Sequence, residues 1–368
     1  MKVAVVSHAY VTAVNHDKLE ALARLADVAV TLLVPSSWPA AFGVLRPPAR
    51  GDGYRIVAAP VVFAGHIGGF VFRGGLRALA GQDVVHAELE PWSLGALQCL
   101  LVAPATPLVV FTWENLERPL RRLARVVERI VLRRAAFVIA GNAGARERMR
   151  RRGVPDRRLA VLPQFGVDPA RYTAGDAGRV AAPFPVASPR PRPVVGYVGR
   201  LVPEKGVDVL IDAMSPGLGR LLVVGDGPTR GALEARAAAR GLEAAFTGAV
   251  ADTAVPDHLA AMDVLVLPSR TIPGWAEQFG HALIEAMAAG VPVIGSSSGA
   301  IPEVIGDAGL VFPEGDARAL AGGLARVLGD EPLRKDLAGR GVARVAARFT
   351  HAVVAEAQRG IYARLRRR

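Results

Sequence analysis

Short, unbroken runs of apolar residues alternate with amphipathic segments along most of the chain. Such runs are typical of strands buried in a parallel sheet that helices cover on both faces. Before residue 165 we expect strands at 3–7, 28–34, 54–59, 61–63, 83–86, 107–112 and 137–140, and helices at 17–25, 94–101 and 120–134. After residue 193 we expect strands at 194–199, 221–225, 244–247, 264–268, 291–295 and 310–312, and helices at 207–214, 229–240, 257–262, 281–289 and 317–328. The pattern predicts an α/β protein with two doubly wound sheets in succession.

A proline-rich stretch without periodicity separates the two series. We predict a first domain at 1–165, a linker at 166–193, a second domain at 194–349 and a final helical segment at 350–368. Ligands of parallel sheets bind at the carboxyl ends of the strands, so two such domains would place a cleft between them.

Composition is that of a globular protein, because 51% of the 368 residues are hydrophobic and 21% are charged. The single cysteine, Cys99, excludes an intramolecular disulfide framework and fits a reducing compartment. No signal peptide precedes the first strand, and prolines interrupt the longest apolar tracts. We therefore expect a cytoplasmic protein.

The net charge of +12 is concentrated in one place. Between Arg118 and Arg158 there are 14 arginines and only three acidic residues. Within Arg118–Arg134 an apolar stripe runs beside a cationic face, which suits a helix docked on the anionic inner face of a membrane. A domain helix with solvated arginines is the alternative, and both interpretations stay open. Nucleic-acid binding is disfavoured because interleaved aromatic residues and a recognition motif are both missing.

The segment from residue 268 to 292 contains two carboxylates around an expected helix start. Glu277 precedes the helix and Glu285 lies inside it, on the order of 10 Å away at ~1.5 Å rise per residue. Backbone N–H groups of Phe279, Gly280 and His281 would favour an anion between them. This suits a nucleotide-sugar, whose diphosphate lies between two hydroxyl-bearing rings. Two incidental glutamates on a solvated helix are the alternative.

Two cations follow the first strand of the second domain. Arg200 offers a planar fork of donors and Lys205 a mobile point charge, a combination that neutralises a diphosphate. An ordinary surface turn would look similar. Gly225 opens a Gly-Asp-Gly-Pro turn that permits close backbone approach. Arg230 stands where a dinucleotide fingerprint needs its third glycine, which disfavours nicotinamide oxidoreductase chemistry.

Together these segments resemble the nucleotide-sugar domain of retaining glycosyltransferase family 4, also called glycosyl transferases group 1. Five blocks in the family's order carry the resemblance: Gly199-Arg-Leu…Glu-Lys-Gly206, Gly225-Asp-Gly-Pro228, Asp263-Val-Leu-Val-Leu-Pro-Ser269, Glu277-Gln-Phe-Gly…Glu285…Pro292 and Gly299-Ala-Ile-Pro-Glu-Val-Ile305. The resemblance implies the GT-B fold, in which two Rossmann-like domains face each other across a cleft and a C-terminal helix returns to the first.

The resemblance also implies residue roles. Arg200 and Lys205 would hold the diphosphate and stabilise the leaving nucleotide, and Glu277 would contact the transferred sugar beside the Phe279–Gly280 backbone. Glu285 would accept from the ribose hydroxyls. Gly225 would let the backbone approach the donor, and Val250 lies in a loop that would border the base. No cluster of metal ligands stands out in the sequence, so we expect neither a metal nor another cofactor.

The first domain departs from the common family pattern. Ser7-His-Ala-Tyr10 replaces a Gly-Gly turn, and Trp113-Glu114-Asn115 follows the expected strand at 107–112. A family branch with Trp-Glx-Asn at this place is similar and also has a segment like Glu90-Pro-Trp-Ser93. Glu90 and Glu114 are therefore candidate catalytic residues, with a structural role in loop bonding as the alternative.

We predict a retaining, hexosyltransferase-type enzyme that moves a sugar from a nucleoside diphosphate donor to a glycan, lipid-linked or small-molecule acceptor held by the first domain. A sugar-nucleotide epimerase of the same fold and a non-catalytic basic surface-binding protein are the alternatives.

Overall fold

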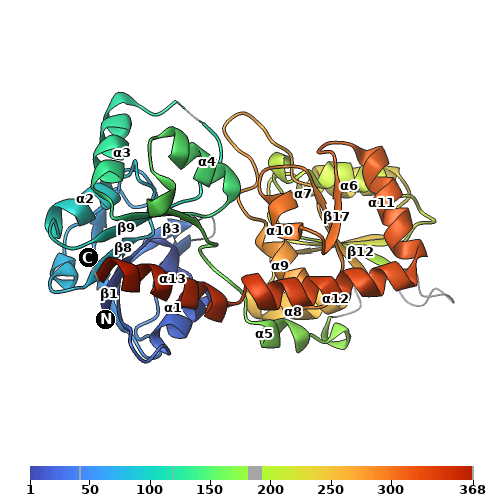
Figure 1. Cartoon of the computed structure of the whole chain (residues 1–368). Helices are drawn as coiled ribbons and strands as arrows, with labels where there is room; N and C mark the ends of the chain where they lie inside the picture. Colours follow the sequence, from blue (N-terminus) through green and yellow to red (C-terminus); the bar gives the residue numbers. More distant parts are fainter. Residues whose placement is uncertain (41–42, 118, 181–192, 367–368) are drawn as a thin grey trace. The chain divides into compact units, whose positions relative to one another are not determined.

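A computed structural model describes residues 1–40, 43–117, 119–180 and 193–366, and the chain divides into two compact units (Figure 1). The first unit contains Met1–Gly166 and the segment from His351 onward. The second unit contains Val167–Thr350. Among the described residues, no helix combines the length and the apolar character needed to cross a membrane.

A seven-stranded parallel sheet forms the centre of the first unit. Its strand order is β11-β10-β9-β8-β1-β2-β5, and the strands nearest the middle are almost fully buried. The bounds are β1 Lys2–Val6, β2 Ala29–Pro35, β5 Arg55–Ala59, β8 Val84–Ala87, β9 Leu108–Thr112, β10 Phe137–Ala140 and β11 Leu159–Val161. Two small antiparallel pairs accompany it, namely β3 (Trp38–Ala40) with β4 (Gly43–Leu45) and β6 (Val61–Val62) with β7 (Val71–Phe72).

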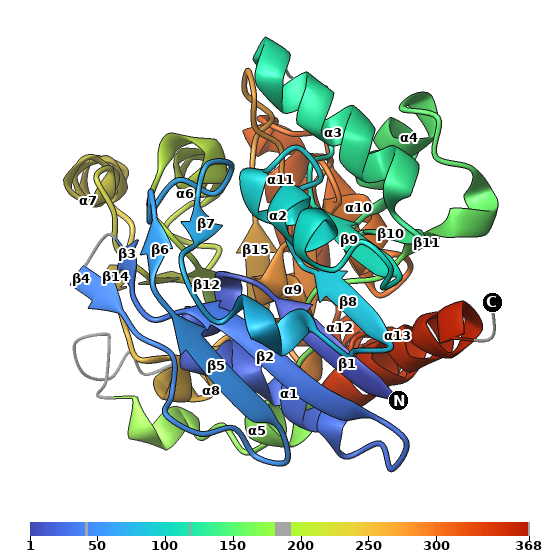
Figure 2. The same cartoon turned by 90° about the vertical axis from the view of Figure 1, so that its left-hand side faces the viewer.

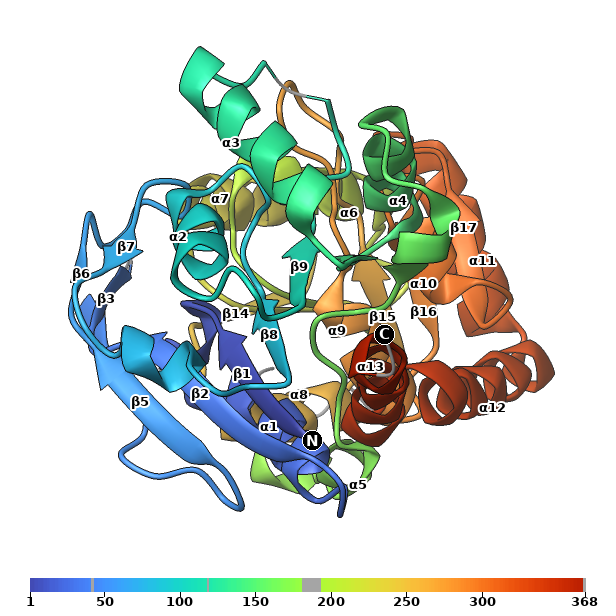
Figure 3. The ribbon, with the colours of Figure 1, turned by 60° about the vertical axis from the view of Figure 1, so that its left-hand side comes forward.

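The α-helices in the described part of this unit are α1 His16–Ala23, α2 Leu94–Val102, α3 Arg122–Arg134, α4 Ala143–Arg151 and α13 His351–Arg366. Helices α1 and α13 pack against each other, as do α2 and α3 (Figures 2 and 3). Helix α13 is fixed to β8 by a 2.7 Å hydrogen bond between His86 Nδ1 and the hydroxyl of Tyr362, both fully buried. The last helix of the chain is therefore part of the first unit's core.

A six-stranded parallel sheet with the order β14-β13-β12-β15-β16-β17 forms the centre of the second unit. Its strands are β12 Val194–Val198, β13 Arg220–Val224, β14 Ala244–Gly248, β15 Val264–Leu267, β16 Val293–Ser296 and β17 Gly309–Phe312. The helices around it are α5 Pro169–Thr173, α6 Val207–Ala213, α7 Arg230–Ala239, α8 Val255–Ala260, α9 His281–Ala288, α10 Ile301–Ile305, α11 Ala317–Gly329 and α12 Glu331–Arg348. The prediction of two doubly wound parallel sheets is confirmed.

The expected linker at 166–193 is wrong over its first half. Residues from Val167 belong to the second unit, where α5 packs against α8 and α9. The Asp168 carboxylate accepts a 3.0 Å hydrogen bond from the N–H of Ala170, and Pro169 occupies the first helical position. An N-cap aspartate followed by proline is a helix-start signal that the proline-rich surroundings concealed. Residues 181–192 of the expected linker lie outside the described residues.

Three further helices are absent from the sequence-based expectation: α4, α10 and α12. Helix α12 has glycines at positions 339 and 341, which weaken helix propensity. Leu337, Gly341 and Val345 are nevertheless buried at i, i+4 and i+8. Gly341 packs closely on α9, because an added Cβ there would lie 3.0 Å from Met287 Cγ. A glycine that lowers propensity is therefore used for close helix packing.

Candidate functional site

The site residues expected in the second unit all follow the carboxyl ends of four neighbouring strands. Arg200 and Lys205 follow β12, Gly225 follows β13, Val250 follows β14 and the segment from Glu277 to Gly280 follows β15. Because all four strands are parallel, their carboxyl ends lie at one edge of the sheet. This is the edge at which ligands of doubly wound sheets bind.

Glycine backbones hold the first three of these loops together. Gly225 has a φ of 141°, and an added Cβ would lie only 1.8 Å from the carbonyl oxygen of Gly199. The N–H of Gly199 donates to the oxygen of Val224 at 3.0 Å, and the N–H of Gly225 donates to that of Gly248 at 3.0 Å. Any larger residue at 225 would force the loops apart, so the close approach requires glycine.

Glu277 is a tightly held carboxylate, with 6% of its surface exposed. Its Oε2 accepts a 2.6 Å hydrogen bond from Lys205 Nζ and a 2.8 Å bond from Ser269 Oγ. The ammonium group of Lys205 also lies 5.1 Å from the centre of the Trp275 ring. The structure thus joins two residues to which the sequence assigned separate parts of the donor, the diphosphate and the sugar.

Arg200 differs from Lys205 in its surroundings. Its backbone oxygen accepts a 2.8 Å hydrogen bond from the hydroxyl of Tyr197, which fixes the loop. Its side chain is exposed and makes no ion pair with the residues that the structure describes. A guanidinium on a fixed loop with free donors can bind an anion without first breaking a salt bridge.

Glu285 lies within α9 and is half-buried. One of its oxygens accepts a 3.0 Å hydrogen bond from the hydroxyl of Tyr172, which stands in α5. Burial raises the pKa of Glu285 above its ordinary value, and the Tyr172 hydrogen bond opposes that rise. Sequence reasoning missed Tyr172 because it assigned that segment to the linker; the Asp-Pro helix start was the signal that could have found it.

The start of α9 is shaped by Gly280, whose φ of 84° suits glycine. As the N-cap residue of α9, Gly280 has no side chain that could cap the helix. Phe279 is 6% exposed and packs edge-on against Phe349, with ring centres 5.7 Å apart. Burial lowers the pKa of His281 to about 4, so this residue is neutral near pH 7. Helix α9 therefore begins directly after a glycine turn, and its first residue, His281, is uncharged near pH 7.

In the first unit, Glu90 joins the loop after β8 to the end of β9. Its carboxylate accepts hydrogen bonds from Thr112 Oγ1 at 2.6 Å and from the backbone N–H of Trp113 at 2.8 Å. Burial, together with the charge of Glu114, raises the pKa of Glu90 to about 7. The two expected carboxylates thus lie close enough to interact electrostatically at the carboxyl edge of this sheet.

A buried polar network lies beside them. Glu88 is 3% exposed and forms an ion pair with the fully buried ammonium group of Lys18. The same carboxylate accepts 2.9 Å hydrogen bonds from Tyr10 and Gln164. Burial by itself would raise the pKa of Glu88, but Lys18 and then His86 hold it below its ordinary value. The sequence does not reveal the pairing of Lys18 with Glu88, because the two residues are 70 positions apart.

Among the described residues, no three or more His, Cys, Asp or Glu side chains gather as metal ligands would. Arg200 and Lys205 are two cations at the carboxyl edge of the second sheet that could neutralise a negatively charged ligand.

Comparison with known protein families assigns both halves of the chain. The model described as "Glycosyl transferases group 1" matches residues 181–343, and the "Glycosyl transferase 4-like domain" matches residues 11–164. A GDP-mannose-dependent alpha-(1-6)-phosphatidylinositol monomannoside mannosyltransferase of Mycobacterium tuberculosis is 31% identical over 77% of this chain and 76% of its own length. The chain belongs to the glycosyl transferases group 1 family, as the sequence motifs led us to expect.

Other relatives come from Streptomyces. A 2-deoxystreptamine N-acetyl-D-glucosaminyltransferase of Streptomyces fradiae is 33% identical over 64% of this chain, and a 2-deoxystreptamine glucosyltransferase of Streptomyces kanamyceticus is 33% identical over 68%. The matched regions span 60% and 65% of the lengths of these two relatives.

Solved structures share the fold. HepE of Anabaena in complex with UDP has a TM-score of 0.75 at 20% identity, covering 99% of this chain and 100% of that one. Sucrose-phosphate synthase from Thermosynechococcus elongatus has a TM-score of 0.72 at 22% identity, with 99% of each chain covered. The GT-B fold is confirmed.

Proposed function

We propose that this protein is a glycosyltransferase that moves a sugar from a nucleoside diphosphate donor to an acceptor with retention of the anomeric configuration. The observation that carries the proposal is the arrangement at one sheet edge of an exposed guanidinium, that of Arg200, and a mostly buried, hydrogen-bonded Lys205–Glu277 pair. Family membership supports the same activity.

The cations would stabilise the leaving group. Departure of a nucleoside diphosphate builds negative charge on the phosphate oxygens, and fixed donors aimed at that charge lower the barrier. Arg200 supplies a bidentate fork. The side chain of Lys205 is 15% exposed, so its charge is less screened by water than that of a surface lysine. The proposal therefore needs no further cofactor for this step.

The carboxylates would bind the donor's hydroxyl groups. Lys205 and Ser269 hold Glu277 in place, so that its carboxylate would accept from the transferred sugar beside Phe279 and Gly280. Glu285 would accept from the ribose, with Tyr172 fixing its orientation. Gly225 would allow close approach of the backbone to the donor, and Val250 would border the base. The start of α9, whose N-cap residue is Gly280, would favour the diphosphate.

The acceptor would bind to the first unit, near Glu90 and Glu114. Both oxygens of Glu90 already accept hydrogen bonds, one from Thr112 and one from Trp113. Glu90 would therefore act chiefly by positioning the chain that carries Glu114. Glu114 would then receive the acceptor's proton. A carboxyl of Glu90 whose pKa lies at about 7 can also take part in that transfer near neutral pH.

A panel of nucleotide-sugars tests the proposal. UDP is bound by the HepE neighbour, and GDP-mannose is the donor named for the mycobacterial relative, so UDP- and GDP-sugars come first. We expect at least one donor to release free nucleoside diphosphate in the presence of hydroxyl acceptors, with the product's anomeric configuration retained. Glu277→Gln should slow this release about 100-fold, since a neutral amide accepts more weakly from a sugar hydroxyl and cannot pair with Lys205.

Three outcomes would count against it. An acceptor-independent interconversion of sugars would indicate an epimerase. Failure to bind any donor would leave a non-catalytic surface-binding protein. A product of inverted configuration would exclude retention while leaving glycosyl transfer in place.

We also propose that the protein works in the cytoplasm and docks on the inner membrane face through α3. Leu123, Val126 and Ile130 are 66%, 51% and 41% exposed on this helix, beside its arginines, whereas Val127 and Val131 face the core. The sequence left a membrane-docked and a solvated helix open, and this exposed apolar stripe favours the first. Arg118, at the start of the expected segment, lies outside the described residues.

Co-sedimentation with phosphatidylglycerol vesicles tests the docking. We expect binding that weakens as salt rises from low to physiological ionic strength, and that falls at least about fivefold in Leu123→Ser/Val126→Ser, since each exposed side chain would lose roughly 1 kcal/mol of burial. Equal binding by that variant and by Val44→Ser/Val342→Ser, which removes two exposed apolar side chains elsewhere, would contradict docking through α3.

A further inference from the structure

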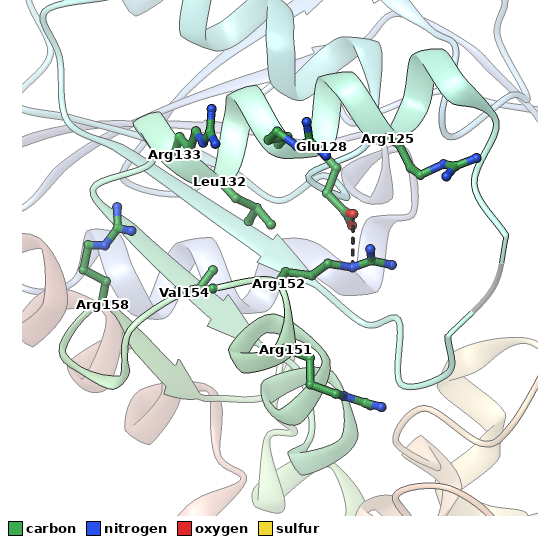
Figure 4. Close-up of a pocket in the computed structure, with 10 residues that line it drawn as sticks. Arg125, Glu128, Leu132, Arg133, Arg151, Arg152, Val154 and Arg158 are labelled. Carbon is green, nitrogen blue, oxygen red and sulfur yellow. Dashed lines mark ion pairs between the residues drawn. The ribbon is translucent and has the colours of Figure 1, made fainter.

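A cavity of about 320 Å³ lies in the first unit between α3 and the end of α4 (Figure 4). Its charged lining consists of six arginines and one glutamate, namely Arg125, Arg129, Arg133, Arg151, Arg152, Arg158 and Glu128. This is an unusual excess of one charge around a single cavity, because like charges at close range repel each other.

Helix geometry explains how one helix supplies three of the arginines. Arg125, Arg129 and Arg133 are four residues apart, so they lie on one face of α3 with the turns of the helix between them. Val127 and Val131 face the core, and the exposed stripe of Leu123, Val126 and Ile130 occupies a third face. The cavity is therefore distinct from the apolar stripe, although both belong to α3.

The single carboxylate in the lining does not neutralise the cavity. Glu128 is 2% exposed, and its Oε1 accepts a 2.5 Å hydrogen bond from Arg148, which is fully buried outside the lining. Its other oxygen lies 3.4 Å from Arg152 Nε, the ion pair drawn in Figure 4. Arg152 also donates to Glu117 Oε2 at 2.7 Å, outside the lining. The other five lining arginines have no carboxylate partner among the described residues, so positive charge remains in excess.

Two of these arginines are held by hydrogen bonds to the backbone. Arg125 Nε donates to the oxygen of Leu120 at 3.1 Å, and Arg158 Nη1 donates to that of Ala135 at 2.8 Å. Three others, Arg129, Arg133 and Arg151, make no hydrogen bond or ion pair with the residues that the structure describes. The cavity thus combines fixed guanidinium groups with others whose donors are free.

The part of the cavity lined by Arg133, Arg151 and Arg158 lies away from the acceptor region. Helices α3 and α4 end just before β10 and β11 begin, so their last turns lie at the amino edge of the sheet. Glu90 and Trp113 lie at the carboxyl edge. Basic residues at helix ends complement the helix dipole, but about half an elementary charge per helix does not balance the five arginines that lack a carboxylate partner among the described residues.

We propose that this cavity is a binding site for a phosphate group, separate from the nucleotide-sugar site. Guanidinium forks match phosphate oxygens in pairs, and free forks around a cavity of this size suit a diphosphate or a phosphate-bearing head group. The ligand is a soluble phosphate compound or the phosphate of an anionic lipid, since the chemistry of recognition is the same for both.

Calorimetry with inorganic pyrophosphate tests the site. The measurement uses the full chain carrying Arg200→Ala and Lys205→Ala, which removes the proposed donor site. Pyrophosphate binding that remains is then due to the cavity, so this test does not depend on whether the donor-site proposal is correct. We expect binding that weakens at least about tenfold when Arg129→Gln and Arg133→Gln are added, since removing a charge-assisted hydrogen bond costs roughly a factor of ten in affinity. Arg122→Gln with Arg134→Gln removes the same charge from exposed α3 positions outside the cavity lining and should change affinity less than about twofold.

Vesicles distinguish the two sources of phosphate. If pyrophosphate displaces the chain from phosphatidylglycerol vesicles, and Arg129→Gln/Arg133→Gln also weakens vesicle binding, the ligand is a lipid phosphate. If vesicle binding ignores pyrophosphate, the ligand is a soluble phosphate compound. Absence of pyrophosphate binding, or an equal decrease in the cavity variant and its matched control, would overturn the proposal.

Discussion

Replacing Arg200 and Lys205 together by alanine is expected to lower donor turnover by roughly 10³-fold or more, because each donor aimed at developing charge contributes about 10²–10³ to the rate. The decrease should appear mainly in kcat, since charge on the leaving diphosphate is largest in the transition state. Affinity for free nucleoside diphosphate should also fall, which calorimetry can measure.

The two single variants separate chemistry from folding. Arg200→Ala removes a side chain without an ion pair to described residues, so its effect on turnover has no structural component from a broken salt bridge. Lys205→Ala removes the cation that pairs with the buried carboxylate of Glu277 and should also destabilise the second unit. Arg334→Ala with Lys335→Ala is the matched control in α12. Wild-type turnover in the Arg200/Lys205 double variant would refute the donor assignment.

Lys18→Met is expected to lower the free energy of unfolding of the first unit by about 3–5 kcal/mol, because it leaves a buried carboxylate without its cation. Glu88 would keep its hydrogen bonds from Tyr10 and Gln164 but would lose the ammonium group that holds its charge inside the protein. Denaturant unfolding measured at neutral pH gives the size of the effect.

A second substitution makes the test specific. In Lys18→Met/Glu88→Leu both charges are gone, and much of the stability should return, since a buried pair is often replaceable by apolar side chains. Lys2→Met makes the same substitution at an exposed position and should change stability by less than about 0.5 kcal/mol. If Lys18→Met matches that control, the buried pair contributes nothing to stability.

Most strands of the two sheets could be predicted from the sequence because each is a local apolar run. Strand β11 (Leu159–Val161), at the edge of the first sheet, was not predicted, since its three residues are too few to form a recognisable pattern. The same local rule placed Arg200, Gly225 and Glu277 at one edge, since every strand they follow is parallel to its neighbours. Helix α12 escaped prediction because its glycines and short apolar stripe serve packing against α9, which no local pattern reveals.

The sequence by itself determined the family, the two-sheet architecture and which loops carry the candidate donor-binding residues, because these follow from local patterns and motif order. Only the tertiary structure decided the partners: Lys205 with Glu277, Tyr172 with Glu285, and Lys18 with Glu88, pairs separated by 72, 113 and 70 positions. It also decided that several arginines of the arginine-rich segment line a cavity between α3 and the end of α4. Such pairings depend on how strands and helices pack in space, and distance along the chain does not encode that.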